Sequence, residues 1–265
     1  MTLANEVGRR STSSGLQLDV LIPVYNEGHN ILGVVDALRR EVSTPFNILI
    51  CYDFEEDDTL AALEEGDTTG LSIRLVRNTG SGAHQAVLSG FAASDAPFVL
   101  VYPADDDYNA GIVDAMAEIA GRGHDIVCAS RFMKGGGMVG YPWIKSGLLR
   151  LANFTLYHLA RLPTQDASNG FRLFSRRAVD TIVIESDRGF TYSIELLVKC
   201  HRLGWAVGDV PAQWFERRIG QSRFRVFEWL PAYLRWYFYA FATTYLRRGP
   251  ATVPVRQFVA PAGER

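Results

Sequence analysis

Short runs of apolar residues, many of them β-branched, recur along the first half of the chain, and polar or glycine-containing segments separate them. Near-continuous apolar runs of this length are typical of β-strands that are buried on both faces. Between the runs, apolar residues recur at helical spacing; Ile31, Val34, Val35 and Leu38, for example, fall on one helix face. The pattern predicts strands at 18–24, 46–52, 71–76, 97–102 and 124–129, and helices at 27–40, 57–65, 83–93 and 111–120.

This alternation of strands and helices predicts the fold class. It is typical of βαβ units, and it indicates a Rossmann-like α/β protein with a mostly parallel sheet flanked by helices. After residue 130 the alternation stops, and the glycine-rich stretch "MKGGGMVGYP" is expected to be a mobile loop. Beyond it, the sequence predicts helices at 145–161 and 192–203, a short strand at 170–174 and a strand-like segment at 205–211.

Residues 226–246 carry nine aromatic side chains and are flanked by arginines such as Arg223 and Arg247. Aromatic residues with flanking arginines suit the boundary between lipid headgroups and acyl chains. Glu228, Pro231 and Arg235 argue against a spanning helix. We therefore expect an amphipathic helical segment that docks on a membrane surface. The alternative is a terminal helix that packs its aromatic side chains on the core, or on a second subunit of a homo-oligomer.

Composition excludes some functional classes. The net charge of −2 argues against a nucleic-acid-binding protein, which would usually be basic. The three cysteines have no metal-ligand spacing and are interpreted as reduced packing residues of a cytosolic protein. The N-terminal residues lack the apolar core of a signal peptide. The first predicted strand is followed by "PVYNEG" and not by GxGxxG, which argues against a dinucleotide-dependent dehydrogenase.

Acidic side chains follow three of the predicted strands: Glu27 after the first, Asp53 after the second, and the triplet 105–107 after the fourth. Ligands of open parallel sheets bind beyond the carboxyl ends of the strands, so these side chains should meet at one edge. Carboxylates this close together repel each other unless a cation neutralises them. Oxygen ligands suit Mg²⁺ or Mn²⁺, whose coordination is typically completed by phosphate oxygens, and this suggests a nucleotide diphosphate as ligand.

A structural interpretation of the same acidic residues stays open. An acidic turn after a strand is often solvated, or it supplies the N-cap of the next helix. Asp107 or Asn109 could cap the helix at 111–120. Asp57 or Asp58 could favour the positive end of the helix at 57–65.

Seven segments between Leu18 and Phe224 resemble, in the same order, those of family 2 glycosyltransferases with the A-type nucleotide-sugar fold, in particular dolichyl- and polyprenyl-phosphate mannosyl- and glucosyltransferases. The segments are "LIPVYNEGHNI", "NTGSGAHQAVLSGFAAS", "VYPADDDYN", "VCASRFMKGGG", "DASNGFRLFSRRAV", "GFTYSIELLVKCHRLGWAVGDVP" and "FERRIGQSRF". The resemblance implies a catalytic domain at 18–224. From the residues themselves we expect a flexible polar leader at 1–17, amphipathic interfacial helices at 225–246 and a disordered, proline-containing tail at 247–265.

The resemblance also implies a role for each matching position. Pro23, Tyr25 and Glu27 are expected to line the nucleotide, and Asp53 is expected to contact its base. Asp105 and Asp107 are expected to hold the metal and the sugar diphosphate. The phosphates of donor or acceptor are expected to be faced by Arg131, Lys145, Arg217 and Arg223. Asp105, Asp107, Arg131 and Arg217 are the expected catalytic residues.

Three positions depart from the family pattern. Tyr52 stands where the family usually has the first of two adjacent aspartates, and Arg223 stands where a lysine is frequent. The Asp-x-Asp motif fits two registers. In one register, Asp105 and Asp107 are the two aspartates of the motif. In the other, Pro103 stands at the position of the first aspartate, Asp105 is the second, and Asp107 is a following metal ligand. The spacing to the next helix favours this second register.

The function implied is an inverting transfer of a hexose from a nucleotide-diphosphate sugar, of the GDP-mannose or UDP-glucose type, to polyprenyl or dolichyl phosphate. The enzyme would work peripherally on the cytoplasmic face of a membrane. A lipid phosphate is already an anion and needs cations to hold it, whereas a saccharide hydroxyl needs a base. For a base, the downstream sequence offers Asp166 and Glu195, although Glu195 with Lys199 is also a common helix-surface pair. A saccharide acceptor, or a binding module without turnover, remain the alternatives.

Overall fold

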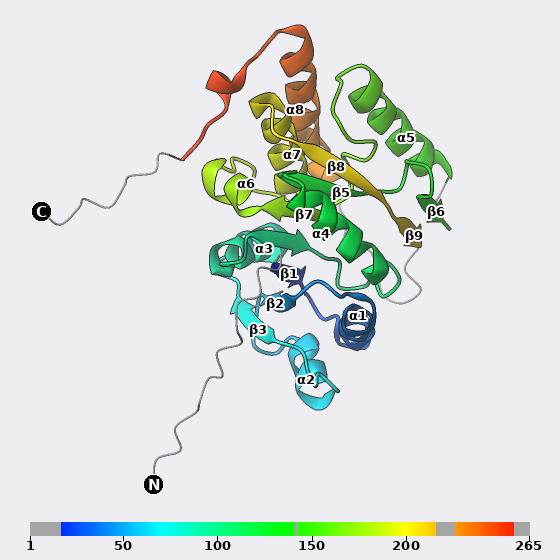
Figure 1. Ribbon diagram of the computed structural model, residues 1–265, viewed down its shortest axis with the longest axis vertical. Coiled ribbons are helices and arrows are strands. Elements are labelled where there is room, and N and C mark those ends of the chain that lie inside the picture. Colours follow the sequence, from blue (N-terminus) through cyan, green and yellow to red (C-terminus); the bar gives the residue numbers. More distant parts are fainter. Residues whose placement is uncertain (1–16, 141–142, 216–225, 257–265) are drawn as a thin grey trace, which may run out of the picture.

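The computed structural model describes residues 17–140, 143–215 and 226–256. A sheet of seven strands runs through the protein between layers of helices (Figure 1). Its strands are β1 (Leu18–Pro23), β2 (Phe46–Tyr52), β3 (Ile73–Arg77), β4 (Phe98–Val101), β5 (Ile126–Ser130), β7 (Arg172–Ser175) and β8 (Val207–Pro211). They lie in the order β3-β2-β1-β4-β7-β5-β8. Only β7 runs antiparallel to its neighbours in this sheet, so the mostly parallel α/β fold is confirmed.

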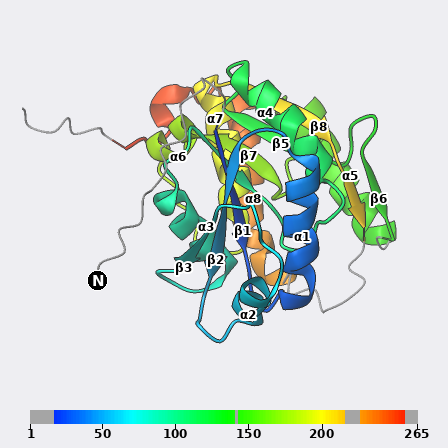
Figure 2. The ribbon, with the colours of Figure 1, turned by 60° about the horizontal axis from the view of Figure 1, so that its bottom comes forward.

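Helices cover both faces of the sheet, which explains why the strands are apolar throughout. The α-helices are α1 (Gly28–Glu41), α2 (Asp58–Glu65), α3 (Gly82–Ala93), α4 (Val113–Gly121), α5 (Trp143–His158), α6 (Arg176–Thr181), α7 (Thr191–Leu203) and α8 (Val226–Tyr245). Side chains of α1, α2 and α4 join one buried cluster. Those of α3 and of α5 to α8 join the other. Figure 2 shows α1 and α3 on opposite sides of β1 and β2.

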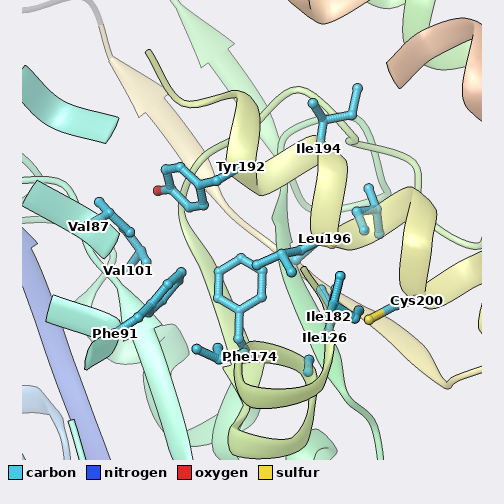
Figure 3. Packing of buried hydrophobic residues seen from close by; sticks show 14 of the residues in the cluster. Val87, Phe91, Val101, Ile126, Phe174, Ile182, Tyr192, Ile194, Leu196 and Cys200 are labelled. Carbon is cyan, nitrogen blue, oxygen red and sulfur yellow. The ribbon is translucent and has the colours of Figure 1, made fainter. Parts of the chain in front are cut away.

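Aromatic rings join the sheet to the helices of the second cluster. Phe174 of β7 lies between α3 and α7 (Figure 3). The ring centroid of Phe174 is 5.6 Å from that of Phe91 in α3, and the ring of Tyr192 in α7 is 5.9 Å from Phe91. All three cysteines of the chain are buried and free, and burial raises the pKa of the Cys51 and Cys128 thiols to about 12. They are packing residues, as the sequence indicated.

The pair Glu195 and Lys199 differs from a helix-surface pair, because both side chains are completely buried in α7. The Lys199 ammonium donates to Glu195 (2.5 Å) and to the carbonyl of Val183 (2.6 Å). Glu195 also accepts from the backbone N–H groups of Glu185 (2.7 Å) and Ser186 (2.8 Å). The four-residue spacing of Glu195 and Lys199 in the sequence predicts that they contact each other, but it does not predict that they are buried. The pair fastens the loop before α7 to the core.

Several elements differ from the sequence expectations. The glycine-rich segment that was expected to be mobile contains β6 (Gly137–Val139), which pairs in parallel with β9 (Gln213–Phe215). The short helix α6 was not predicted, although Ser175 caps it by accepting from the N–H of Ala178. In the stretch 247–265, which was expected to be disordered, Pro250–Thr252 form a 3₁₀ turn and Val255 forms a β-bridge with Ile182.

Helix α8 is apolar on two faces. Trp236 and Ala240 are buried against the core, whereas Leu234 and Phe238 are exposed. The alternative of core packing therefore holds for part of the aromatic set. No helix within the described part of the chain is long and apolar enough to cross a membrane.

Two helical glycines give a test of how closely the layers approach. A Cβ on Gly90 of α3 would lie 2.2 Å from Leu21 Cδ1 and 2.7 Å from Cys51 Sγ, whereas a Cβ on Gly147 of α5 would meet nothing within 4 Å. Overpacking should make Gly90→Ala destabilising by about 1–3 kcal/mol. Gly147→Ala should stabilise by up to about 1 kcal/mol, because alanine favours a helix. Urea unfolding measures both; a stabilised Gly90→Ala would contradict the close approach of α3 to the sheet.

Candidate active site

The carboxyl ends of β1, β2 and β4 meet at one edge of the sheet. β1 pairs in parallel with β2 on one side and with β4 on the other. Beyond the strand ends, the N–H of Val24 donates to the carbonyl of Cys51 (2.9 Å), and the N–H of Tyr102 donates to that of Leu21 (2.8 Å). The polar segments that follow the three strands therefore leave the sheet together. The predicted convergence of these segments is confirmed.

The first turn of α1 is anchored by side chains at the start of α2. The N–H of Asn26, which has a left-handed φ of 53°, donates to Asp57 (3.0 Å). The N–H of Glu27 donates to Thr59 (3.0 Å), and that of Gly28 donates to Asp58 (2.9 Å). Asp57 also accepts from the N–H of Thr59 and so caps α2. Asp57 thus has the structural role at the start of α2 that the sequence left open, whereas the Asp58 carboxylate bonds to the start of α1.

The predicted nucleotide-lining residues on the first loop differ in exposure. Pro23 is half-buried. Tyr25 is 43% exposed, and its ring meets the edge of Phe54 at 5.3 Å. Glu27 is nearly buried and accepts from the side-chain amide of Asn30 (2.7 Å). The loop therefore presents an aromatic surface at the rim of the sheet, with an anchored carboxylate behind it.

Asp53 connects the end of β2 to the start of α3. One carboxylate oxygen of Asp53 accepts from the side-chain amide of Asn78 (2.6 Å), and the other accepts from the backbone N–H of Gly82 (2.7 Å). Gly82 has a φ of +81°, a conformation that favours glycine. These two bonds fix Asp53 at the rim. Its predicted contact with the base stays a prediction.

The acidic loop after β4 places its three aspartates in three environments. Asp105 is half-buried, Asp106 is buried and Asp107 is exposed. Burial raises the pKa of Asp106 to about 6, although hydrogen bonds from Asn109 and Tyr108 oppose this rise. Asp107 reaches toward α1, where a Cβ on Gly33 would lie 3.6 Å from its carboxylate. Asp106 is therefore held within the loop itself, whereas Asp107 is exposed and Asp105 is accessible in part.

The side chains of this loop fit a metal that arrives with a phosphate ligand. Asp105 and Asp107 offer carboxylate oxygens, which Mg²⁺ and Mn²⁺ accept. Across residues 17–140, 143–215 and 226–256, no three His, Cys, Asp or Glu side chains form a group that could hold an ion. Mg²⁺ in nucleotide sites is typically bound by one or two carboxylates plus phosphates, so such a group is not required.

Arg131 follows β5 and is held by a buried carboxylate. Its Nε donates to Asp166 at 2.7 Å and one Nη donates to the other oxygen at 3.0 Å, while Arg131 is only 9% exposed and Asp166 is not exposed at all. The same Nη donates to Ser168 (2.8 Å). Burial alone would raise the pKa of Asp166, but Arg131 and the surrounding donors hold it below its usual value. The geometry gives Arg131 a fixed position; its contact with a phosphate stays a prediction.

The remaining predicted phosphate-binding residues are not placed. Arg217 and Arg223 lie outside the described residues, and so does the side chain of Lys145, whose backbone belongs to α5.

Sequence reasoning missed several residues that shape this edge. Asn78 orients Asp53, and Phe54 packs on Tyr25. Asn109 was interpreted as a candidate helix cap, yet its side chain makes no cap bond and instead contacts Asp106 and Gln213. An asparagine three residues after an aspartate is a weak local signal, and no sequence signal indicates a partner 104 residues away.

A mostly parallel sheet with polar side chains gathered at its carboxyl edge is typical of α/β proteins that bind their ligands at that edge. The family described as glycosyl transferase family 2 matches residues 19–183, more than half of the chain, and the chain belongs to this family. The protein is therefore a glycosyltransferase with a nucleotide-sugar-binding fold, and the resemblance found in the sequence is confirmed.

Two relatives align with most of this chain. Polyprenol monophosphomannose synthase of Mycolicibacterium smegmatis is 26% identical over 228 residues, which cover 79% of this chain and 85% of that protein. Glycosyltransferase AglJ of Haloferax volcanii is 29% identical over 208 residues, which cover 77% of this chain and 64% of that protein.

Solved structures share the fold at lower identity. Glucosyl-3-phosphoglycerate synthase from Mycobacterium tuberculosis, crystallised with Mn²⁺, UDP-glucose and phosphoglyceric acid, aligns with a TM-score of 0.61 at 17% identity. The alignment covers 87% of this chain and 80% of that one. The same enzyme with Mn²⁺, UDP and glucosyl-3-phosphoglycerate gives a TM-score of 0.60 at 18% identity, with the same coverage.

The ion pair between Arg131 and Asp166 predicts a pH-dependent contribution to stability. Because folding lowers the pKa of Asp166, its carboxylate stabilises the protein above the unfolded value of about 3.9, and this contribution is lost as the pH falls through the folded value. Asp166→Asn should destabilise the protein by about 3–5 kcal/mol at pH 7, because it leaves Arg131 buried without its counter-charge.

Urea unfolding between pH 3 and pH 7 measures this contribution. The variant should lose stability less steeply than the wild type as the pH falls below 4. Glu118→Gln is the control, because its partner Arg122 forms an exposed pair. Parallel pH profiles for wild type and Asp166→Asn would contradict the assigned pKa shift.

Proposed function

We propose that the protein transfers a hexose, with inversion, from a nucleoside-diphosphate sugar of the GDP-mannose or UDP-glucose type to polyprenyl or dolichyl phosphate at a membrane surface. The observation that carries this proposal is an exposed apolar face on α5 and α8, beside Arg131. A transferase with a soluble saccharide acceptor has no need of such a face, whereas a polyprenyl chain has to be met by apolar side chains.

Helix α5 supplies most of the apolar face. Trp143, Leu148, Leu151 and Phe154 are between 56% and 83% exposed. Exposed apolar side chains this large and this close together mark an interaction surface. The sequence of α5 contains Lys145 and Arg150 but no aspartate or glutamate. This combination of apolar and cationic side chains suits the surface of a membrane with anionic lipids.

Helix α8 continues the face. Leu230, Leu234 and Phe238 recur every four residues and are each at least 40% exposed. The hydroxyl groups of Thr155 in α5 and Tyr237 in α8 lie 2.7 Å apart, which ties the two helices together. We infer that α5 and α8 dock as one surface and that the predicted interfacial segment 225–246 is only half of it.

A groove in this face is lined by Phe132, whose ring contacts Arg131. It has a volume of about 430 Å³, and Phe132, Arg150 and Phe154 are among the residues that line it. The guanidinium groups of Arg131 and Arg150 lie 5.3 Å and 5.5 Å from the centre of the Phe132 ring. The groove therefore places apolar surface next to two cations, which suits a phosphate attached to a lipid chain.

An anionic acceptor also agrees with the state of the two downstream carboxylates. Asp166 is paired with Arg131, and Glu195 is paired with Lys199, and both carboxylates are fully buried. Neither is placed to take a proton from a saccharide hydroxyl. A phosphate oxygen attacks as an anion and needs no such base.

The donor would bind at the carboxyl edge of β1, β2 and β4. In this proposal Pro23, Tyr25, Glu27 and Asp53 line the nucleotide, and Asp105 and Asp107 hold Mg²⁺ or Mn²⁺. A metal held there would supply positive charge to balance the charge of the departing diphosphate. Arg131, Lys145, Arg217 and Arg223 hold phosphates of donor or acceptor. The solved structures with Mn²⁺ and UDP-glucose, and the name of the mycobacterial relative, support the donor class and the lipid acceptor respectively.

The donor site makes a specific prediction. A preferred nucleoside diphosphate among GDP, UDP and dTDP should raise the melting temperature only with Mn²⁺, because ligand binding to the folded state stabilises it in proportion to affinity. Asp105→Ala should abolish this shift and lower transfer by about a hundredfold or more. Asp95→Ala, an exposed aspartate before the amino end of β4, is the matched control. An unchanged shift in the presence of a chelator would argue against the metal role of Asp105 and Asp107.

The acceptor surface makes a second prediction. The double variant Leu148→Ser with Leu151→Ser should bind anionic phosphatidylglycerol vesicles about tenfold or more weakly, because each exposed leucine contributes apolar area to docking. Leu75→Ser, on an exposed position of the edge strand β3, should bind like the wild type. Cosedimentation measures binding, and extraction of labelled sugar into organic solvent measures lipid product. Transfer to a soluble saccharide with no solvent-extractable product would favour the alternative acceptor.

A further inference from the structure

The side chain of Asn109 joins two segments that lie 104 residues apart. Its amide nitrogen donates to Asp106 (2.7 Å) and to the carbonyl of Gln213 (2.8 Å). Its amide oxygen accepts from the N–H of Gln213 (3.0 Å). The Asn109 side chain thereby makes the same pair of hydrogen bonds to the Gln213 backbone that a neighbouring strand would make. Both protons of the Asn109 side-chain amide are engaged in hydrogen bonds. The Asn109 side chain is only 4% exposed, whereas Gln213 is an exposed residue.

On one side, this contact holds the acidic loop. Asp106, between Asp105 and Asp107, accepts from the N–H groups of Tyr108 (3.3 Å) and Asn109 (2.9 Å). The buried hydroxyl of Tyr102 donates to the carbonyl of Asp106 (2.9 Å). Fixing the middle residue of the triplet at both its side chain and its backbone fixes the directions in which the two neighbouring aspartates leave the chain.

On the other side, the contact holds β9, which is attached to the end of β5. The N–H of Ala212 donates to the carbonyl of Ser130 (2.9 Å), directly before Arg131. The side-chain amide of Gln213 donates to the carbonyl of Gly135 (2.9 Å), and β9 pairs with β6. Asn109 therefore ties the segment that carries the carboxylates to the one that carries Arg131.

A second contact runs in parallel with the first. The N–H of Phe215 donates to the hydroxyl of Tyr108 (3.3 Å), and the two rings meet edge to face at 4.6 Å. Both connections leave the acidic loop after its last aspartate and end on β9. The loop and the strand are thus joined through two adjacent residues, Tyr108 and Asn109.

We propose that Asn109 is a positioning residue that, through Gln213, sets the separation between the Asp105 and Asp107 carboxylates and the Arg131 segment, and thereby sets affinity for the metal-bound diphosphate. This inference rests on the proposed function and adds a residue to it. A bound metal with a diphosphate would be contacted by the carboxylates on one side and by the Arg131 segment on the other. A shift of about 1 Å in one side can cost about a hundredfold in rate.

The chain offers a matched pair of substitutions for a test. Asn109→Asp places a carboxylate against Asp106 and against the carbonyl of Gln213. Asn47→Asp makes the same change beside another buried aspartate, because the Asn47 amide donates to Asp19 (3.0 Å) at the amino edge of the sheet. Both variants should unfold more easily than the wild type. Only Asn109→Asp should change metal-dependent binding.

The measurements are the GDP or UDP dissociation constant with Mn²⁺ by calorimetry, the Mn²⁺ concentration for half-maximal transfer, and KM for polyprenyl phosphate. For Asn109→Asp we expect the first two to rise about tenfold or more, and KM for the lipid to change less than twofold. Asn47→Asp should leave all three at wild-type values. Equal values for Asn109→Asp and wild type, in protein that is folded, would overturn the proposal.

A double variant separates positioning from folding. Asp106→Asn combined with Asn109→Asp restores an amide–carboxylate contact within the loop, but it turns a carboxylate toward the carbonyl of Gln213. We expect its melting temperature to recover most of the loss, while the Mn²⁺ requirement stays raised. Recovery of both would overturn the role of the Gln213 contact. A wild-type protein that neither binds a nucleoside diphosphate with Mn²⁺ nor transfers sugar would sink the proposed function, and this inference with it.

Discussion

The parallel pairing of β1 with both β2 and β4 is the constraint on which the rest of the structure depends. It brings three loops to one edge, although they are separated by tens of residues in the chain. The apolar faces of these strands are covered on both sides, so only the strand ends are available for polar chemistry. The loops that carry Tyr25, Asp53 and Asp105 leave the same edge of the sheet because the strands that precede them are paired side by side and in parallel.

Charged groups near this edge are divided between two tasks. Asp166 is buried against Arg131, and Glu195 is buried against Lys199, so that each charge is neutralised by its partner and by backbone groups. They hold Arg131 and the loop before α7 in place. The aspartates of the acidic loop are different, because Asp106 is buried, Asp105 is half-buried and Asp107 is exposed.

The sequence predicts the sheet well because buried parallel strands leave a strong local signal. β1 and β2 coincide with their apolar runs to within a residue, and the acidic residues after them indicate the edge that carries chemistry. Contacts that depend on distant segments leave no such signal. Nothing near Asn109 specifies Gln213, and the spacing of Glu195 and Lys199 is the same in a buried pair as in a solvated one. The two-sided apolar character of α8 likewise emerges only when the core beneath Trp236 is known.

The burial of all three native thiols has a practical consequence. Since burial raises the pKa of Cys51 and Cys128 to about 12, scarcely any thiolate exists there at neutral pH to attack an alkylating reagent. The third thiol, Cys200, is equally enclosed. A single cysteine introduced on the outward side of α5 would therefore be the one position that a maleimide dye modifies readily. Fluorescence from such a label could follow the approach of this helix to lipid without any removal of native residues.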